Sequence, residues 1–140
     1  DLLQSNIRMH PMLGKTSFNF QENIFQNGKP AFTFSEFKKS IGDVVLWRRG
    51  YAAYHLACVI DDAHQGITDV IRGEDLFEAT KIHVVIQNVL DFPTPKYHHH
   101  QLILDEAGHR LAKRSDAQSI KTYRALGYTP EDIRELLGLV

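Results

Sequence analysis

Apolar residues recur with different periods in different parts of the chain. In the first segment, up to Gly42, they alternate with polar residues over short pieces such as Phe18-Asn19-Phe20 and Phe32-Thr33-Phe34, and six of the eight phenylalanines lie there. A period of two is typical of β-strands, and Asn27-Gly28 is a hairpin signal. The pattern predicts short antiparallel strands or an irregular insertion over residues 1–42.

Beyond Asp43 the alternation gives way to short continuous apolar runs. Runs of this kind, ended by polar residues, are typical of strands that are covered on both faces. They predict strands at Val44–Trp47, Leu56–Ile60, Val70–Ile71 and His100–Leu104. We expect the second of these strands to begin at Tyr54.

Helical periodicity begins after Gly73. Apolar residues are spaced there by three or four positions, at Leu76, Ala79, Ile82, Ile86 and Val89. Asp75 and Glu78 have the spacing of a capping box, and Pro93 and Pro95 end the helix. Strands that alternate with helices in this way predict an α/β fold.

Two short helices are predicted near the C-terminus. The first has an apolar stripe and ends at Gly127, and its stripe consists of Ile120, Tyr123 and Leu126. Thr129-Pro130 supplies the cap and the first-turn proline of the second helix. Its inward-facing residues are expected to be Ile133, Leu136 and Leu137.

Composition and charge narrow the classes of protein. With 43% hydrophobic residues among 140, the chain can bury the core of one domain, and its net charge of −1 gives no general basic surface for nucleic acid. Any RNA contact should therefore be local. Cys58 is the single cysteine, so the chain can form neither an internal disulfide nor a thiolate zinc cage. No apolar run reaches the roughly 20 residues that cross a bilayer, and we expect a soluble, cytoplasmic monomer.

The basic loop Arg110-Leu111-Ala112-Lys113-Arg114 is the strongest candidate for catalysis. It follows a predicted strand and the turn Asp105–Gly108, and it precedes a helix. A lysine in such a loop can approach a triphosphate and stabilise the charge that develops on its phosphoryl oxygens. The alternative for any isolated basic pentamer is a solvated surface turn.

Arg72 and Tyr54 are candidates for binding a carboxylate. Arg72 ends a predicted strand, and open α/β sheets bind ligands at the carboxyl ends of their strands. Its guanidinium can hold a carboxylate through paired hydrogen bonds, although an ion pair with Glu74 or Asp75 is an equal alternative. The hydroxyl of Tyr54 can hydrogen-bond the same carboxylate, but buried tyrosines more often use it for structural partners.

Two polar clusters are poor metal sites. Asp61-Asp62 contains the oxygen ligands that Mg²⁺ prefers, but neighbouring residues of a strand point to opposite faces. The same alternation makes His98-His99-His100 unsuited to one tetrahedral ion. We expect no metal in this chain and a structural role for Asp61 and Asp62.

The motifs together resemble the catalytic domain of class I glutamyl- and glutaminyl-tRNA synthetases. The resemblance covers roughly Gly42 to the C-terminus, and its three segments in order are Tyr54–Asp62, Ile67–Leu76 and Arg110–Arg114. Some details are similar to the paralogous branch of this family that attaches glutamate to the queuosine base of tRNA(Asp). They are Asp61–Thr68 with its Gln65-Gly66, and Gly73–Phe77 with Thr80.

The resemblance implies roles for individual residues. Tyr54 and Arg72 fall on the glutamate-binding tyrosine and arginine of the family. Lys113 falls on the second lysine of the KMSKS-type signature that binds ATP, and Arg110 replaces the first lysine with its charge kept. Ala112 replaces the usual serine, so we expect slower activation. The fold implied is the second half of a Rossmann-type catalytic domain.

The resemblance also implies glutamate, ATP with Mg²⁺ and queuosine-bearing tRNA(Asp) as substrates. The sequence contains no HIGH-type motif and no cysteine-containing zinc region, so we expect the C-terminal half of an enzyme, inactive alone, with any zinc in the other half. Residues 1–42 would be the insertion, 43–109 the second Rossmann half, and 110–140 the signature loop with C-terminal helices. The alternatives are an ordinary glutamyl-tRNA synthetase core and a non-catalytic nucleotide-fold module.

Overall fold

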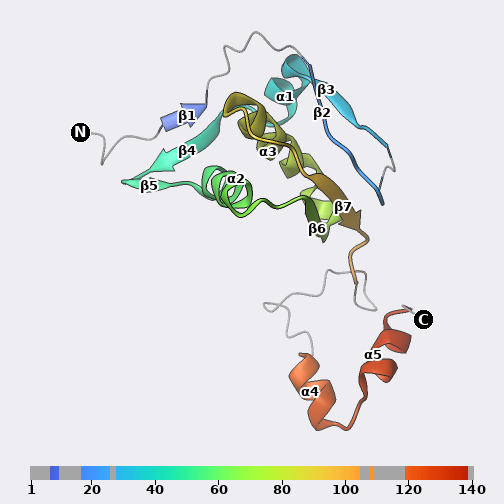
Figure 1. Ribbon diagram of the computed structural model, residues 1–140. Coiled ribbons are helices and arrows are strands. Elements are labelled where there is room, and N and C mark those ends of the chain that lie inside the picture. The colour runs from blue at the N-terminus through green and yellow to red at the C-terminus, as the bar shows by residue number, and fades with distance from the viewer. Residues whose placement is uncertain (1–6, 10–16, 26–27, 105–107, 109–118, 139–140) are drawn as a thin grey trace. The chain divides into compact units, whose positions relative to one another are not determined.

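The computed structural model describes residues 7–9, 17–25, 28–104, 108 and 119–138 (Figure 1). The chain divides into two compact units, Asp1–Gln101 and Leu102–Val140. The first unit contains all of the described strands and three of the α-helices, and the second contains the two remaining α-helices.

An antiparallel sheet of three strands lies at one end of the first unit. Its order is β1 (Ile7–Met9), β4 (Val44–Arg48) and β5 (Tyr51–Ala52). Arg49 and Gly50 have φ angles of 51° and 84°, as a two-residue hairpin turn requires. The strand predicted at Val44–Trp47 is confirmed, but it is not covered on both faces.

A second antiparallel pair carries the alternating phenylalanines. Strands β2 (Ser17–Asn19) and β3 (Ala31–Thr33) place Phe18 opposite Phe32, and the two buried rings stack with centroids 5.4 Å apart. The prediction of short antiparallel strands is confirmed for these residues, while Asn27 of the predicted turn lies outside the described residues.

The helix α1 (Phe34–Ser40) continues directly from β3. Thr33 and Glu36 form a capping box at its first turn, in which the Thr33 hydroxyl accepts the Glu36 amide hydrogen at 3.2 Å. Phe37 is its buried residue and packs 6.3 Å from Phe32 between ring centroids. The cap thus fixes where the strand ends and turns the next aromatic ring into the core.

Residues Tyr54–Gln65 form the helix α2, so the strand predicted at Leu56–Ile60 was wrong. A short apolar run fits a buried strand and one face of a helix equally well, and here Val59 alone is fully buried. Gly66 ends the helix with a left-handed φ of 67°. The carbonyl of Asp62 accepts the amide hydrogen of Ile67 at 2.9 Å, and this backbone contact closes the end of the helix.

A β-α-β unit follows α2. The parallel strands β6 (Asp69–Gly73) and β7 (Lys96–His100) are joined by a short 3₁₀ turn and the helix α3 (Phe77–Val89). The strand at Val70–Ile71 and the helix after it are confirmed. Asp75 lies within the 3₁₀ turn, Glu74–Leu76, so it is not the N-cap of α3 that its spacing with Glu78 had predicted.

The structure has the strand β7 at Lys96–His100, so the strand predicted at His100–Leu104 was placed too late in the chain. The pairing of β7 with β6 runs from Asp69 opposite Lys96 to Gly73 opposite His100. At Gly73 the chain of β6 turns into the 3₁₀ turn, so a strand beyond His100 would lose its partner along β6. The end of one strand therefore set the end of the other.

The helix α3 is the centre of the first unit and contacts both α2 and the hairpin strand β2 (Figure 1). Its middle turn, Val84–Ile86, is buried. Phe77 at its start is buried, with its ring centroid 5.8 Å from that of Phe20. Burial of each such ring contributes about 1.5 to 3 kcal/mol.

The helices described in the second unit are α4 (Ile120–Ala125) and α5 (Pro130–Leu136). Both predicted helices are confirmed, and Thr129 forms a capping box with Asp132. Leu136 was expected to face inward, but it is 60% exposed. Two helices of this length share only a short contact, so they cannot bury a whole apolar stripe. Within the described part of the chain, no helix has the length and apolar character needed to span a membrane.

Candidate functional site

Arg72 lies near the carboxyl end of the parallel strand β6, as the sequence predicted. Its side chain is half-buried, and three neighbours hold it. Nη2 donates to the hydroxyl of Thr80, Nε donates to Nε2 of His99 at 3.2 Å, and the guanidinium carbon lies 5.1 Å from the ring centroid of Tyr97. Burial lowers the pKa of Arg72, but an arginine remains charged at neutral pH.

Arg72 carries a positive charge that no recorded ion pair neutralises, since the salt bridges recorded among the described residues do not include Arg72. Nη1 has no recorded partner there. The only buried side-chain polar atom without a partner in that part of the chain is Gln87 Oε1, so no buried, unpaired Nη1 is found there. This arrangement suits the binding of an anion.

Glu22, which contacts the same His99 as Arg72, is a fully buried carboxylate. One oxygen accepts the amide hydrogens of Ile24 at 2.9 Å, Phe25 at 3.0 Å and His99 at 3.2 Å, and the other contacts His99 Nδ1. Burial raises the pKa of Glu22, but the hydrogen bonds from His99 and the backbone outweigh it and lower the pKa to about 2. Glu22 is therefore an anion at neutral pH.

His99 links the anion to the cation. Arg72 Nε can only donate, so His99 Nε2 must accept, and the ring hydrogen lies on Nδ1, which faces Glu22. Thr80 Oγ1 is 2.9 Å from the same Nε2. We refer to Glu22, Arg72, Thr80 and His99 as the Arg72 network.

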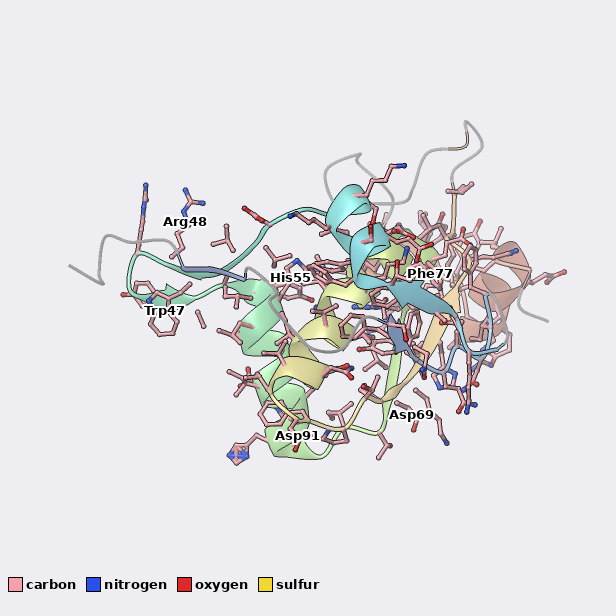
Figure 2. All side chains as sticks on the ribbon, turned by 90° about the horizontal axis from the view of Figure 1, so that it is seen from above. Trp47, Arg48, His55, Asp69, Phe77 and Asp91 are labelled. Atoms are coloured by element: carbon pink, nitrogen blue, oxygen red, sulfur yellow. The ribbon has the colours of Figure 1, made fainter. Side chains whose placement is uncertain are left out.

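A pair of histidines lies between α2 and α3. His55 Nδ1 and His83 Nε2 are 3.0 Å apart, and Figure 2 labels His55 near the start of α2. Burial, with smaller contributions from the charge of Arg72 and from the neighbouring His55, lowers the pKa of His83 to about 4. Burial and Arg72 also lower the pKa of His55. Both rings are therefore neutral at pH 7.

Tyr54 is the first residue of α2, and not of a strand as predicted. It is 68% exposed, and its ring contacts His55 and His83 at centroid distances of 5.3 and 6.2 Å. Cys58 is the main cause that raises the pKa of Tyr54, whereas Arg72 lowers it, so the phenol shares an electrostatic neighbourhood with the guanidinium. The predicted contact of its hydroxyl with a substrate remains a prediction.

The remaining polar candidates have separate environments. Burial raises the pKa of the Cys58 thiol, which donates to Asp62 at 3.7 Å and so does not resemble a reactive thiolate. His98 contacts Asp69 at 2.9 Å, His99 is buried and His100 is exposed, which matches the predicted alternation of faces. Within the described residues, no group of three or more metal-ligating side chains is assembled.

The predicted ATP loop cannot be compared with the structure. Arg110, Leu111, Ala112, Lys113 and Arg114 all lie outside the described residues. Their predicted roles therefore remain predictions.

Sequence reasoning missed Glu22 and the role of His99. A signal was present, because Phe18, Phe20 and Glu22 alternate with exposed residues and all three are buried. A period of two that places a glutamate on the apolar face predicts a buried carboxylate with a partner. The identity of that partner was not visible in the local pattern.

Comparisons with known proteins agree with this picture. Residues 6–140 match the family described as tRNA synthetases class I (E and Q), catalytic domain. A glutamyl-Q tRNA(Asp) synthetase from Rhodobacter capsulatus is 59% identical over 102 residues, which cover 72% of this chain and 37% of that protein. Another from Xanthomonas axonopodis pv. citri is 52% identical over 81 residues, 57% of this chain and 27% of that protein.

Solved structures show the same fold. A glutamate tRNA ligase from Elizabethkingia meningosepticum, in complex with its amino acid, has a TM-score of 0.69 at 26% identity, and the match covers 91% of this chain and 28% of that one. The predicted α/β class and the resemblance to glutamyl-Q tRNA(Asp) synthetases are therefore confirmed. The chain spans about a third of the length of the curated relatives it matches. It belongs to the class I tRNA synthetases of the E and Q type, as part of their catalytic domain.

Proposed function

We propose that this chain provides part of the glutamate pocket and the ATP-phosphate loop of a ligase that activates glutamate and transfers it to the queuosine base of tRNA(Asp). The observation that carries the proposal is Arg72, a half-buried cation that is held firmly and has no carboxylate partner among the described residues. The similarity to glutamyl-Q tRNA(Asp) synthetases supports the choice of reaction.

The glutamate pocket uses Arg72 and Tyr54. Glutamate carries two carboxylates, and a guanidinium with an accessible Nη1 can bind one of them through charge-assisted hydrogen bonds. Tyr54 lies at the exposed start of α2, in the electrostatic neighbourhood of Arg72. Its hydroxyl can donate to the same ligand, while the neutral imidazoles of His55 and His83 add no competing charge.

The ATP-phosphate loop uses Arg110 and Lys113. Activation joins a glutamate carboxylate oxygen to the α-phosphorus of ATP, with Mg²⁺, and releases pyrophosphate. Negative charge shifts onto the phosphoryl oxygens in this step, and a fixed cation there lowers the barrier. Lys113 supplies that cation and Arg110 supports the phosphates.

Arg72→Ala in the full-length gene product tests the glutamate pocket. The change removes a charge-assisted contact, typically about 1.5 to 3 kcal/mol, so the KM for glutamate should rise roughly 10- to 100-fold while the KM for ATP stays within a few fold. Glutamate-dependent pyrophosphate exchange measures both. An unchanged glutamate KM with normal kcat would give Arg72 a structural role only.

Lys113→Ala tests the ATP loop in the same assay. Loss of one transition-state donor should lower the single-turnover rate of adenylate formation by roughly 10² to 10³. Lys113→Arg should recover little, because a planar guanidinium does not replace a compact ammonium. Ala112→Ser should raise the rate slightly, and Lys39→Ala on the exposed end of α1 is the matched control. A rate within about twofold of the wild type would exclude the catalytic role.

Transfer to tRNA separates the proposal from its alternative. Purified tRNA(Asp) with queuosine should accept glutamate, and tRNA(Asp) without queuosine and tRNA(Glu) should not. Efficient charging of tRNA(Glu) would instead identify an ordinary glutamyl-tRNA synthetase, the activity named for the structural neighbour.

A further inference from the structure

In the Arg72 network, the imidazole ring of His99 lies between the buried carboxylate of Glu22 and the half-buried guanidinium of Arg72. Glu22 and His99 are both fully buried, and they lie on the hairpin and on β7, whereas Arg72 lies on β6. A carboxylate in direct contact with Arg72 would stabilise its charge but would also occupy its hydrogen-bonding edge. With the imidazole between them, Glu22 can favour the cation from a distance and leave Nη1 free.

The direction of each hydrogen bond follows from the chemistry of the groups. Glu22 is ionised and can only accept, and Arg72 can only donate. His99 satisfies both when its hydrogen lies on Nδ1 and its lone pair lies on Nε2. The other tautomer would place the Nε2 hydrogen against the Nε hydrogen of Arg72. Glu22 therefore selects the ring form that can hold the guanidinium.

The guanidinium is fixed in three directions. His99 accepts from Nε, Thr80 accepts from Nη2, and the buried ring of Tyr97 lies at 5.1 Å from the guanidinium carbon. A mobile arginine side chain loses freedom of rotation about several bonds when it binds a ligand. Because Arg72 is already fixed, the entropy cost of binding is lower. The remaining edge, with Nη1, is the part available to a substrate.

We propose that Glu22 and His99 are positioning residues for glutamate binding, in which Glu22 sets the tautomer of His99 and His99 holds Arg72 with Nη1 toward the substrate carboxylate. This inference rests on the proposed role of Arg72 in the glutamate pocket. Glu22 and His99 act only through Arg72, so their loss should raise the glutamate KM and spare the ATP KM.

Glu22→Gln is the sharpest variant because it keeps the size of the side chain. The glutamine oxygen can still accept the amide hydrogens of Ile24 and Phe25, which turns its NH₂ group toward His99 Nδ1. The ring must then move its hydrogen to Nε2, where it opposes Arg72 Nε. In the full-length gene product, the glutamate KM should rise roughly tenfold, with kcat changed less and the ATP KM within about twofold.

Glu36→Gln is the matched control. It makes the same chemical change at an exposed glutamate whose partner is Thr33 in the cap of α1. Its glutamate KM should equal that of the wild type. A double variant completes the cycle, because Glu22→Gln should add little further loss in an Arg72→Ala background if it acts through Arg72.

The two proposals fail in different ways. If Arg72→Ala leaves the glutamate KM unchanged, the proposed glutamate pocket is wrong. If Arg72→Ala raises it and Glu22→Gln does not, or if the two losses are simply additive, only the positioning role is wrong. Nitrogen-15 NMR of the His99 ring in the wild-type protein needs no variant: we expect the hydrogen on Nδ1, and a hydrogen on Nε2 would overturn the inference even if Glu22→Gln does not fold.

Discussion

Two buried histidines, His99 and His83, are both influenced by Arg72 but have opposite electrostatic surroundings. Both are almost inaccessible to solvent, at 0% and 2% exposed. His99 contacts the ionised Glu22, whereas the recorded hydrogen bond of His83 is to another imidazole, His55. Arg72 donates a hydrogen bond to His99, whereas its positive charge lowers the pKa of His83.

The difference teaches that burial alone does not define what a histidine does. A ring between an anion and a cation is a connector whose loss leaves charges without partners. A buried ring that is paired with a second neutral ring contributes mainly to packing, and its protonation destabilises the fold. The four variants and conditions below separate these two roles, in order of decreasing expected effect.

His99→Phe should cause the largest loss of stability. Phenylalanine can keep the ring contacts with Phe77 and Tyr97, but it leaves the buried charge of Glu22 without its side-chain partner, which typically costs about 3 to 5 kcal/mol. His83→Phe removes a bond between two neutral rings and should cost about 1 kcal/mol. Urea unfolding of the full-length gene product measures both, and equal losses would erase the proposed contrast.

Acidification should lower the stability of the fold through His83. The pKa of His83 is lowered from 6.5 to about 4, so the unfolded chain binds a proton between these values that the folded chain refuses. Stability is therefore present above pH 6.5 and decreases as the pH falls toward 4, by on the order of 2 kcal/mol at pH 5. His55 contributes in the same direction.

The pH effect has an internal control. The lowered pKa of Glu22 stabilises the fold above pH 4.5, and this stabilisation is lost only as the pH falls from 4.5 toward about 2. The interval from pH 6.5 to 5 therefore reports the histidines. Unfolding curves measured at several pH values give the free energy of unfolding as a function of pH. For a His55→Gln, His83→Gln double variant, this free energy should change less between pH 6.5 and 5 than in the wild type. A slope as steep as that of the wild type would show that other groups cause it.

Thr80→Val should have an intermediate effect on the His99 side. The change preserves shape but removes the hydroxyl that accepts from Arg72 Nη2, which should cost about 1 to 3 kcal/mol because the group is buried. Thr80→Ser keeps the hydroxyl and is the matched control. If serine and valine destabilise the protein equally in urea unfolding, the methyl group and not the hydrogen bond is what matters.

Tyr54→Phe should have the smallest effect of the four, at a residue whose ring contacts His83. Tyr54 is largely exposed, so loss of its hydroxyl should leave unfolding unchanged and raise the glutamate KM about fivefold, as expected for one hydrogen bond to a ligand. Tyr51→Phe, on the exposed strand β5, is a control with the same chemical change. A glutamate KM equal to that of the control would remove Tyr54 from the pocket.

Local patterns in the sequence predicted much of the fold. Alternating phenylalanines identified the hairpin, Thr129-Pro130 identified the start of α5, and Val70–Ile71 identified β6. Each of these features depends on neighbours within a few residues, through the period of a strand or the cap of a helix. The position of Arg72 at a strand end was predicted for the same reason.

The failures occurred where local patterns are ambiguous. The run Leu56–Ile60 fits a strand and a helix face equally well, and only its packing against α3 distinguishes the helix α2. The end of β7 depended on where β6 ends, and the exposure of Leu136 depended on how little surface two short helices share.

By itself, then, the sequence determined the family motifs, the fold class and Arg72 as a candidate anion-binding residue. Only the tertiary structure decided what holds that arginine. Glu22 and His99 are 77 positions apart, and His99 and Arg72 are 27 apart, so no local period connects them. Hydrogen-bond direction and burial are properties of the contact between distant segments, and they exist only once those segments pack together.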